Sequence, residues 1–176
     1  FEFTVTDAAG ESDTATVSLT VTAPSAPPPQ ARNDEATTNQ GEAVTVDVLG
    51  NDIDPLGRGL RVTEVGATPA GQATTDGRTV TFTPNPDFFG QTSFVYRVRD
   101  GADSPEREAE AKVAVTVIGR PSAPGTPVAL EGNATATITW AAPPSNGAPI
   151  DNYELRIEGG ESREVGTATG YTWNGL

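Results

Sequence analysis

The sequence predicts an all-β chain made of sandwich-like units in tandem, and three observations support this fold class. Alternating runs rich in Val, Thr and aromatic residues recur at spacings of roughly 8–12 residues, separated by Gly, Pro, Asn and Asp. None of these runs keeps an apolar period of about 3.6 residues, and the 15 Pro and 19 Gly argue further against helices. A short segment at the start of the chain also recurs after about one domain length, which indicates a tandem array.

The repeat begins at the first residue. Residues 1–7 align with 94–100, and residues 17–21 align with 113–117. Aromatic residues match aromatic residues, Val matches Val, and Asp7 matches Asp100. We therefore expect residues 1–22 to be the C-terminal hairpin of one repeat and residues 31–118 to be a complete unit.

The runs that predict strands follow one another along the chain at residues 43–49, 79–83, 94–99, 111–118 and 135–140. Within the complete unit, Phe82, Phe94, Tyr96 and Val98 occupy alternating positions, so their side chains should point into one core. Residues 84–87 (Pro-Asn-Pro-Asp), which come directly after the run at residues 79–83, cannot continue a strand and predict a turn.

Two linkers separate these units. Residues 23–30 (Ala-Pro-Ser-Ala-Pro-Pro-Pro-Gln) favour polyproline II, a semi-rigid spacer of about 3 Å per residue. Residues 119–125 form a shorter linker that Gly interrupts, and residues 126–176 follow it with a different character. The expected architecture is thus a set of antiparallel β-sandwiches joined by Pro-rich linkers and incomplete at both ends.

The complete unit contains four separated motifs in one order. They are Val48 to Gly57, Leu60 to Val62, Val80 to Asn85, and Phe88 to Gly101. In this order they resemble the bacterial Ig-like, cadherin-like tandem repeats of large secreted or surface proteins. The resemblance implies an Ig-like sandwich, and cadherin-like folds place calcium at domain junctions.

The last segment resembles the N-terminal part of a fibronectin type III domain. The motifs that carry this resemblance are Pro121 to Pro124, Thr137 to Trp140, Asn146 to Ile150, and Tyr171 to Leu176. The resemblance implies that Trp140 is a core indole and that the last two strands of the domain lie beyond residue 176.

Composition excludes several classes of function. There is no Cys and no His, so disulfides, thiol chemistry and the usual general base are absent. The net charge is −13, which disfavours nucleic acid as a partner. No stretch has the 18 or so apolar residues of a membrane span. Abundant Ala, Gly, Pro and Arg hint at a GC-rich bacterial source.

One group of carboxylates has a metal-like arrangement. In an Ig-like topology, one pole of the complete unit should gather its first strand, the loop at residues 51–57 and the loop at residues 100–104. The candidate calcium ligands there are Asp34, Asp52, Asp54, Asp100 and Asp103. Oxygen ligands of this kind suit calcium. The competing interpretation is that these residues are ordinary turn formers.

Other candidates have simpler interpretations. Lys112 invites an isopeptide crosslink, but the apolar face of its strand consists of Val113, Val115 and Val117, so Lys112 should face solvent. Asn133 begins a glycosylation-like triplet that arises often by chance. Trp173 could stack on a sugar or lie in the core. A glycosidase-like pair of acids would need a cleft that nothing here predicts.

These observations predict a non-catalytic spacer segment of an extracellular, secreted or cell-surface-anchored bacterial protein, with interdomain calcium as a candidate stiffening ion. Its expected partners are neighbouring domains of the same chain, and a cell-surface protein or polysaccharide is a candidate further partner. The alternative is an adhesive or carbohydrate-binding accessory module of a secreted polysaccharide-active enzyme. Head-to-tail complementation between the two incomplete ends is a further possibility.

Overall fold

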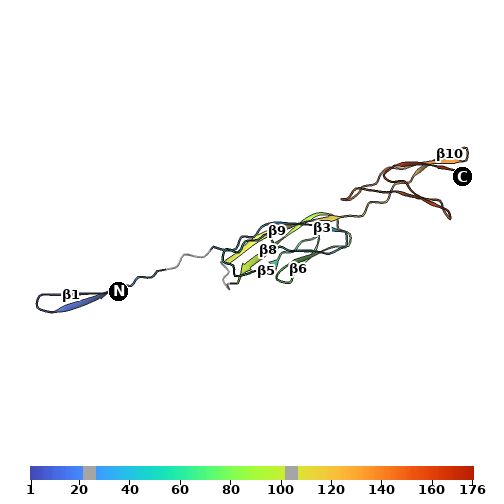
Figure 1. The fold of residues 1–176 in the computed structure, drawn as a ribbon. Helices are drawn as coiled ribbons and strands as arrows, with labels where there is room; N and C mark the ends of the chain where they lie inside the picture. The colour runs from blue at the N-terminus through green and yellow to red at the C-terminus, as the bar shows by residue number, and fades with distance from the viewer. Residues whose placement is uncertain (22–26, 102–106) are drawn as a thin grey trace.

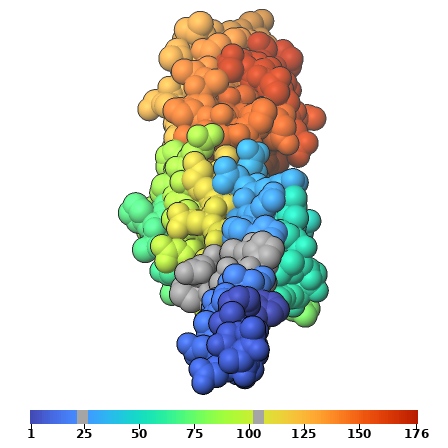
Figure 2. All heavy atoms as spheres, turned by 90° about the vertical axis from the view of Figure 1, so that its left-hand side faces the viewer, coloured from blue at the N-terminus to red at the C-terminus, as the bar shows by residue number. Residues whose placement is uncertain are grey.

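The computed structural model describes residues 1–21, 27–101 and 107–176, and every regular element in these residues is a strand. Three bodies follow one another along the chain: an N-terminal hairpin, a middle domain and a C-terminal segment (Figure 1). The view in Figure 2 shows the same order, from the blue hairpin to the orange and red C-terminal segment. The all-β prediction is confirmed.

The strands have the following bounds: β1 Glu2–Thr6, β2 Ser12–Thr16, β3 Asp34–Asn39, β4 Val44–Val46, β5 Leu60–Val65, β6 Gly71–Thr75, β7 Val80–Pro84, β8 Gly90–Asp100, β9 Glu108–Ile118, β10 Val128–Gly132, β11 Thr135–Thr139, β12 Glu154–Arg156, β13 Ser162–Glu164 and β14 Gly170–Asn174.

The middle domain is a sandwich of two sheets. One sheet has the order β3-β9-β8-β5 and the other has the order β4-β7-β6. The pairs within both sheets are antiparallel except for β3 and β9, which run parallel from Asp34 opposite Val113 to Asn39 opposite Ile118. The sandwich therefore contains one parallel pair that the sequence did not predict.

Alternation along the strands builds the core, as predicted. Phe82, Tyr96 and Val98 are fully buried and Phe94 is nearly so. The rings of Phe82 and Phe94 stack across the two sheets with centroids 5.7 Å apart. On β9 the residues Val113, Val115 and Val117 are buried, while Lys112 is exposed as predicted. Burial of such apolar surface is the main source of stability for a sandwich of this size.

The run predicted at residues 43–49 forms only a short strand, β4. The chain turns immediately afterwards, where the Gly50 amide donates to the Asp47 carbonyl (3.3 Å), although Val48 still reaches the core. The prediction for this strand was therefore too long, because alternation continued into a turn that keeps one inward side chain.

The N-terminal hairpin pairs β1 with β2, and all its residues are exposed. Phe1 and Phe3 are 86% and 65% exposed, whereas their repeat counterparts Phe94 and Tyr96 are 3% and 0% exposed. The same sequence pattern is thus buried in the β8–β9 pair, which the second sheet of the sandwich covers, and exposed in the β1–β2 hairpin, which no second sheet covers in the described residues.

The C-terminal segment has two small sheets, β10-β11-β14 and β12-β13. Trp140 packs edge-on against Tyr153, with ring centroids 5.4 Å apart, and Trp140 is half-buried. Trp173 is the buried indole of the segment, at 7% exposure, and it packs against Tyr171. Both indoles therefore take part in packing within the segment.

The middle domain has two poles. At the N-terminal pole β9 begins and β8 ends, and the entering chain lies beside them, because Nη2 of Arg107 donates to the Pro27 carbonyl and Gln30 is bridged to Ile53. Strand β3 begins farther along, opposite Val113 in the middle of β9. At the C-terminal pole β3 and β9 end and β8 begins, since Gly90 is paired with Val117. The chain therefore enters the domain at one pole and leaves it at the other.

Candidate functional sites at the two poles

The N-terminal pole is organised around the hydroxyl group of Tyr96. This oxygen lies 2.8 Å from the Arg32 carbonyl, 3.1 Å from the Val48 carbonyl and 3.2 Å from Oδ1 of Asp52. A phenol has one proton, so it cannot donate to all three acceptors at once. Burial, followed by the nearby Asp34 and Asp52 carboxylates, raises the pKa of Tyr96, so the phenol stays protonated.

Asp34 and Asp52 are brought together at this hydroxyl, as predicted for the first strand and the loop that starts at residue 51. Oδ1 of Asp34 accepts a hydrogen bond from Nδ2 of Asn51 (2.9 Å), while its Oδ2 is buried and has no hydrogen-bond partner among the described residues. Oδ1 of Asp52 accepts from the backbone amide of Arg32 (2.7 Å).

Both carboxyl groups bind protons more tightly than usual. Burial raises the pKa of Asp34, and the Asp52 carboxylate adds to the effect, while the nearby Tyr96 hydroxyl and the Asn51 amide oppose it. Burial also raises the pKa of Asp52, against the hydrogen bonds from Arg32 and Tyr96. Two carboxylates that lie close to each other resist simultaneous ionisation.

Asp54 has a local role in its own loop. It accepts hydrogen bonds from the amides of Leu56 (3.0 Å) and Gly59 (2.7 Å), the pattern of an Asx turn. Desolvation acts to raise the pKa of Asp54, but these backbone hydrogen bonds outweigh it and lower the pKa.

Asp100 forms a buried ion pair. Its side chain is fully buried, and its Oδ2 accepts from Nε of Arg107 (2.8 Å) and from Nη2 of the same guanidinium. The guanidinium also reaches the carbonyl of Pro27 (3.3 Å), which joins the base of the β8–β9 loop to the chain that enters the domain. Asp103 lies outside the described residues.

These positions do not fit a calcium site made from all the predicted ligands. Asp34 and Asp52 lie together, but Asp54 caps its own loop and Asp100 is paired with Arg107. Among the described residues, no three acidic side chains are placed so that they could hold a metal ion. Calcium binding through Asp34 and Asp52 stays a prediction.

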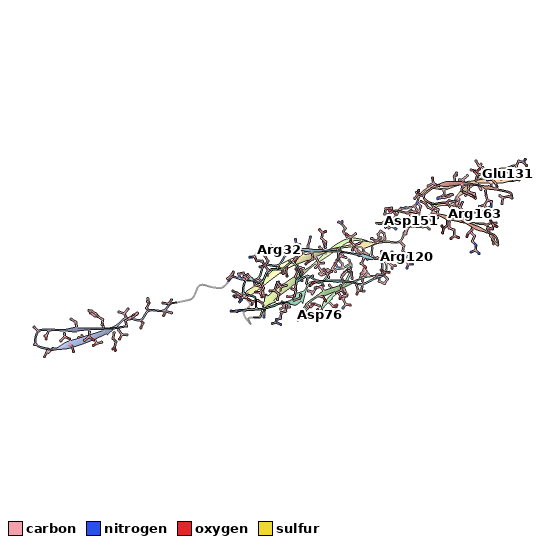
Figure 3. The ribbon with its side chains drawn as sticks, viewed as in Figure 1. Arg32, Asp76, Arg120, Glu131, Asp151 and Arg163 are labelled. Atoms are coloured by element: carbon pink, nitrogen blue, oxygen red, sulfur yellow. The ribbon has the colours of Figure 1, made fainter. Side chains whose placement is uncertain are left out.

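The C-terminal pole contains a second polar cluster. The backbone carbonyl of Asn146 accepts from the Gly119 amide (2.8 Å), and its side-chain amide donates to the Arg120 carbonyl (2.7 Å). Arg120 lies where the middle domain meets the C-terminal segment, as its label in Figure 3 shows. Neither Asn146 nor Gly119 was predicted as functional, and the only sequence signal was the Asn-Gly turn pair.

Comparison with known proteins identifies the family. A family profile described as Bacterial Ig domain matches residues 26–118, which is more than half of the 176 residues. The chain belongs to the bacterial Ig domain family. The match includes both sheets of the middle domain and both poles, so the Tyr96 cluster and the Asp100–Arg107 pair are features of its Ig domain.

The Ig domain chain is also similar to a crystal structure of domains from titin, with 16% sequence identity and a TM-score of 0.47. That match covers 99% of this chain, and the chain spans 63% of the titin chain's length. No curated protein matches the chain significantly. Within the described residues, no helix has the length and apolar character needed to cross a membrane.

Proposed function

We propose that this bacterial Ig domain chain is a non-catalytic spacer segment of a multidomain extracellular or cell-surface protein. The observation that carries the proposal is that the chain enters the Ig domain at one pole and leaves it at the opposite pole. The two long strands β8 and β9 have 11 residues each, so the domain advances the chain by roughly 33 Å at about 3.3 Å per residue.

The charge and the row of bodies support the same role. A net charge of −13 keeps successive segments apart by mutual repulsion and favours solubility. The hairpin, the Ig domain and the C-terminal segment lie in a row in Figure 1. Further repeats of the kind indicated by the alignment of residues 1–7 with 94–100 would lengthen this row.

Small-angle X-ray scattering of the full chain tests the proposal. A compact protein of this length has a radius of gyration of roughly 16 Å. We expect a value well above that, together with a scattering profile typical of folded modules. A radius close to that of a compact domain would contradict the spacer role.

A carbohydrate-binding accessory module remains the alternative. Sugar platforms need exposed aromatic faces, but in the C-terminal segment Trp173 is buried and Trp140 is packed against Tyr153. On the Ig domain the exposed aromatic side chain among the described residues is Phe89, at the C-terminal pole. A glycan array that gave strong, specific binding would favour this alternative over the spacer.

If this spacer binds calcium, its carboxylate ligands are Asp34 and Asp52 alone. Calcium takes six to eight oxygen ligands, so carbonyl groups and water would have to complete the shell around these two carboxylates. The buried, unpartnered Oδ2 of Asp34 is the oxygen that such an ion would engage.

A further inference from the structure

We propose that Asn146 locks the C-terminal segment onto the C-terminal pole of the Ig domain in one orientation, so that this joint of the spacer is rigid. The inference adds to the spacer proposal but concerns the joint alone. A flexible joint would overturn it and leave an elongated spacer intact.

Hydrogen bonds from Asn146 close the linker against the loop between β11 and β12. Its carbonyl accepts from the Gly119 amide (2.8 Å), and its Nδ2 donates to the carbonyl of Arg120 (2.7 Å) and lies 3.3 Å from Oγ of Ser122. A second backbone bond from linker to loop runs beside it, from the Ser122 amide to the Pro144 carbonyl (3.0 Å). A single side chain thus bridges two positions of the linker, and backbone hydrogen bonds on either side connect the same two segments.

The Ig domain holds the same linker from its own side through Gln40. The Gln40 amide donates to the Ile118 carbonyl (2.8 Å), and its side-chain oxygen accepts from the Arg120 amide (3.2 Å). Its Nε2 donates to the Pro86 carbonyl (3.1 Å), which fixes the side chain on the pole. Arg120 is therefore held by Gln40 on one side and by Asn146 on the other.

Steric contact leaves this joint little freedom. Gly119 is buried, and a Cβ atom there would lie 2.8 Å from Cβ and Cγ of Phe89 and 3.0 Å from Cβ of Asn146. Only Gly allows the linker to pass between the pole and the loop at this distance. Gly147 completes the contact, because a Cβ atom on it would lie 3.4 Å from Cα of Ile118.

The identity of residue 146 is constrained in two ways. Its φ of 56° lies in the left-handed region, where Asn is several-fold enriched among residues other than Gly. Its amide must also donate toward the Arg120 carbonyl, which is an acceptor only. The C-terminal pole therefore fits a module that presents an Asn-Gly turn between its second and third strands.

The test is a distance measurement between two spin labels in the full chain. The chain has no Cys, so Arg61→Cys on β5 and Glu131→Cys on β10 introduce two exposed labelling sites, one on each side of the joint. Glu131 lies at the far end of the C-terminal segment in Figure 3, where rotation about the joint moves it most. We expect the unaltered joint to give one narrow distance distribution in a double electron–electron resonance experiment.

Asn146→Asp is the informative variant. It keeps the shape and the tolerance for a left-handed φ, but it replaces the amide donor with a carboxylate that faces the Arg120 carbonyl. We expect the distribution to widen at least about twofold, because the released linker regains the freedom of a Gly- and Pro-containing chain.

Asn174→Asp is the matched control. Asn174 precedes Gly175, as Asn146 precedes Gly147, and its Nδ2 reaches, among the described residues, only the Thr172 carbonyl at 3.5 Å, within β14. The same chemical change and the same added charge should leave the distribution as narrow as in the unaltered chain.

Fluorescence shows whether the variants stay folded. Both Trp residues, Trp140 and Trp173, lie in the C-terminal segment, so their emission reports on that segment. If Asn146→Asp unfolds it, Gly119→Ala tests the joint from the linker, and its Cβ clash should shift or broaden the distribution. A broad distribution in the unaltered chain, or no change in a folded Asn146→Asp or Gly119→Ala chain, would overturn the proposal.

Discussion

At the N-terminal pole of the Ig domain, one phenolic hydroxyl faces acceptors from two separate segments. The acceptors are the backbone carbonyls of Arg32 and Val48 and the carboxylate of Asp52. The ring below the hydroxyl is fully buried, so Tyr96 joins the core to the chain that enters the domain. An acceptor that loses this donor inside the protein is left without compensation.

Tyr96→Phe is expected to destabilise the Ig domain by about 1–3 kcal/mol, because it removes the hydroxyl and leaves buried acceptors unsatisfied. Urea unfolding would measure the loss. Tyr153→Phe is the control, since the Tyr153 hydroxyl makes no hydrogen bond among the described residues, and its effect should be much smaller. Equal effects from the two variants would show that the Tyr96 hydroxyl has no structural role.

The raised pKa values of Asp34 and Asp52 predict a pH dependence. Both lie above the ordinary value of 3.8 in the folded chain. A carboxyl group of this kind contributes stability that is fully present below its unfolded pKa and is lost as the pH rises through its folded pKa. At neutral pH, the ionised pair therefore destabilises the fold.

Asp34→Asn is expected to raise the stability at pH 7 by less than about 1 kcal/mol, because the half-exposed position is partly screened. The new amide still offers an oxygen to Asn51 and cannot ionise. Its advantage over the unaltered chain should shrink as the pH falls toward 4. Thermal melts of both chains across this range would measure it, and an advantage that did not change with pH would contradict the assignment.

At the scale of elements, β6 depends on one glycine. A Cβ atom on Gly71 would lie 2.3 Å from the Thr83 carbonyl oxygen and 2.8 Å from Cα of Pro84, so β6 and β7 pack too closely for any side chain there. These neighbours are backbone atoms, which cannot move aside without breaking the pairing of the two strands.

Gly71→Ala is therefore expected to destabilise the Ig domain by at least about 2 kcal/mol through overpacking. Chemical denaturation would measure the change. Gly125→Ala is the control, since a Cβ atom there meets nothing within 4 Å. A Gly71→Ala chain as stable as the control would mean that the two strands separate easily.

Alternation was sufficient to predict the core strands. Phe82, Phe94, Tyr96 and Val98 are buried as predicted, because each alternates along its strand with residues whose side chains face outward. Strand β6 (Gly-Gln-Ala-Thr-Thr) lacks large apolar residues, so no periodic signal marked it. The parallel pairing of β3 with β9 depends on contacts between segments far apart in the sequence, which local patterns do not record.

The polar sites were harder to predict for the same reason. The expected Ig-like topology placed Asp34 and Asp52 at the same pole, and the two residues do lie close together there. The sequence did not indicate that Arg107 would neutralise Asp100, or that one Asn at the other pole would bridge the linker. Such partners are determined by side-chain geometry at the ends of strands, not by residue type.

For the molecule as a whole, the Asp34→Asn variant gives a direct test of calcium binding. If Asp34 and Asp52 bind calcium, millimolar calcium should raise the melting temperature of the unaltered chain, because an ion that binds only the folded state stabilises it by mass action. The Asp34→Asn chain should show no such rise. Equal melting temperatures in calcium and in chelator for the unaltered chain would contradict the prediction.

The parallel pair of β3 and β9 also determines how the Ig domain would bear mechanical load. The chain enters beside Arg107 at one pole, continues into β3, and departs from the end of β9 at the other pole. Tension between the two ends would slide these strands past each other along their length, in shear. The hydrogen bonds of the pair, from Asp34 opposite Val113 to Asn39 opposite Ile118, would then share the force instead of opening one after another as in a zipper.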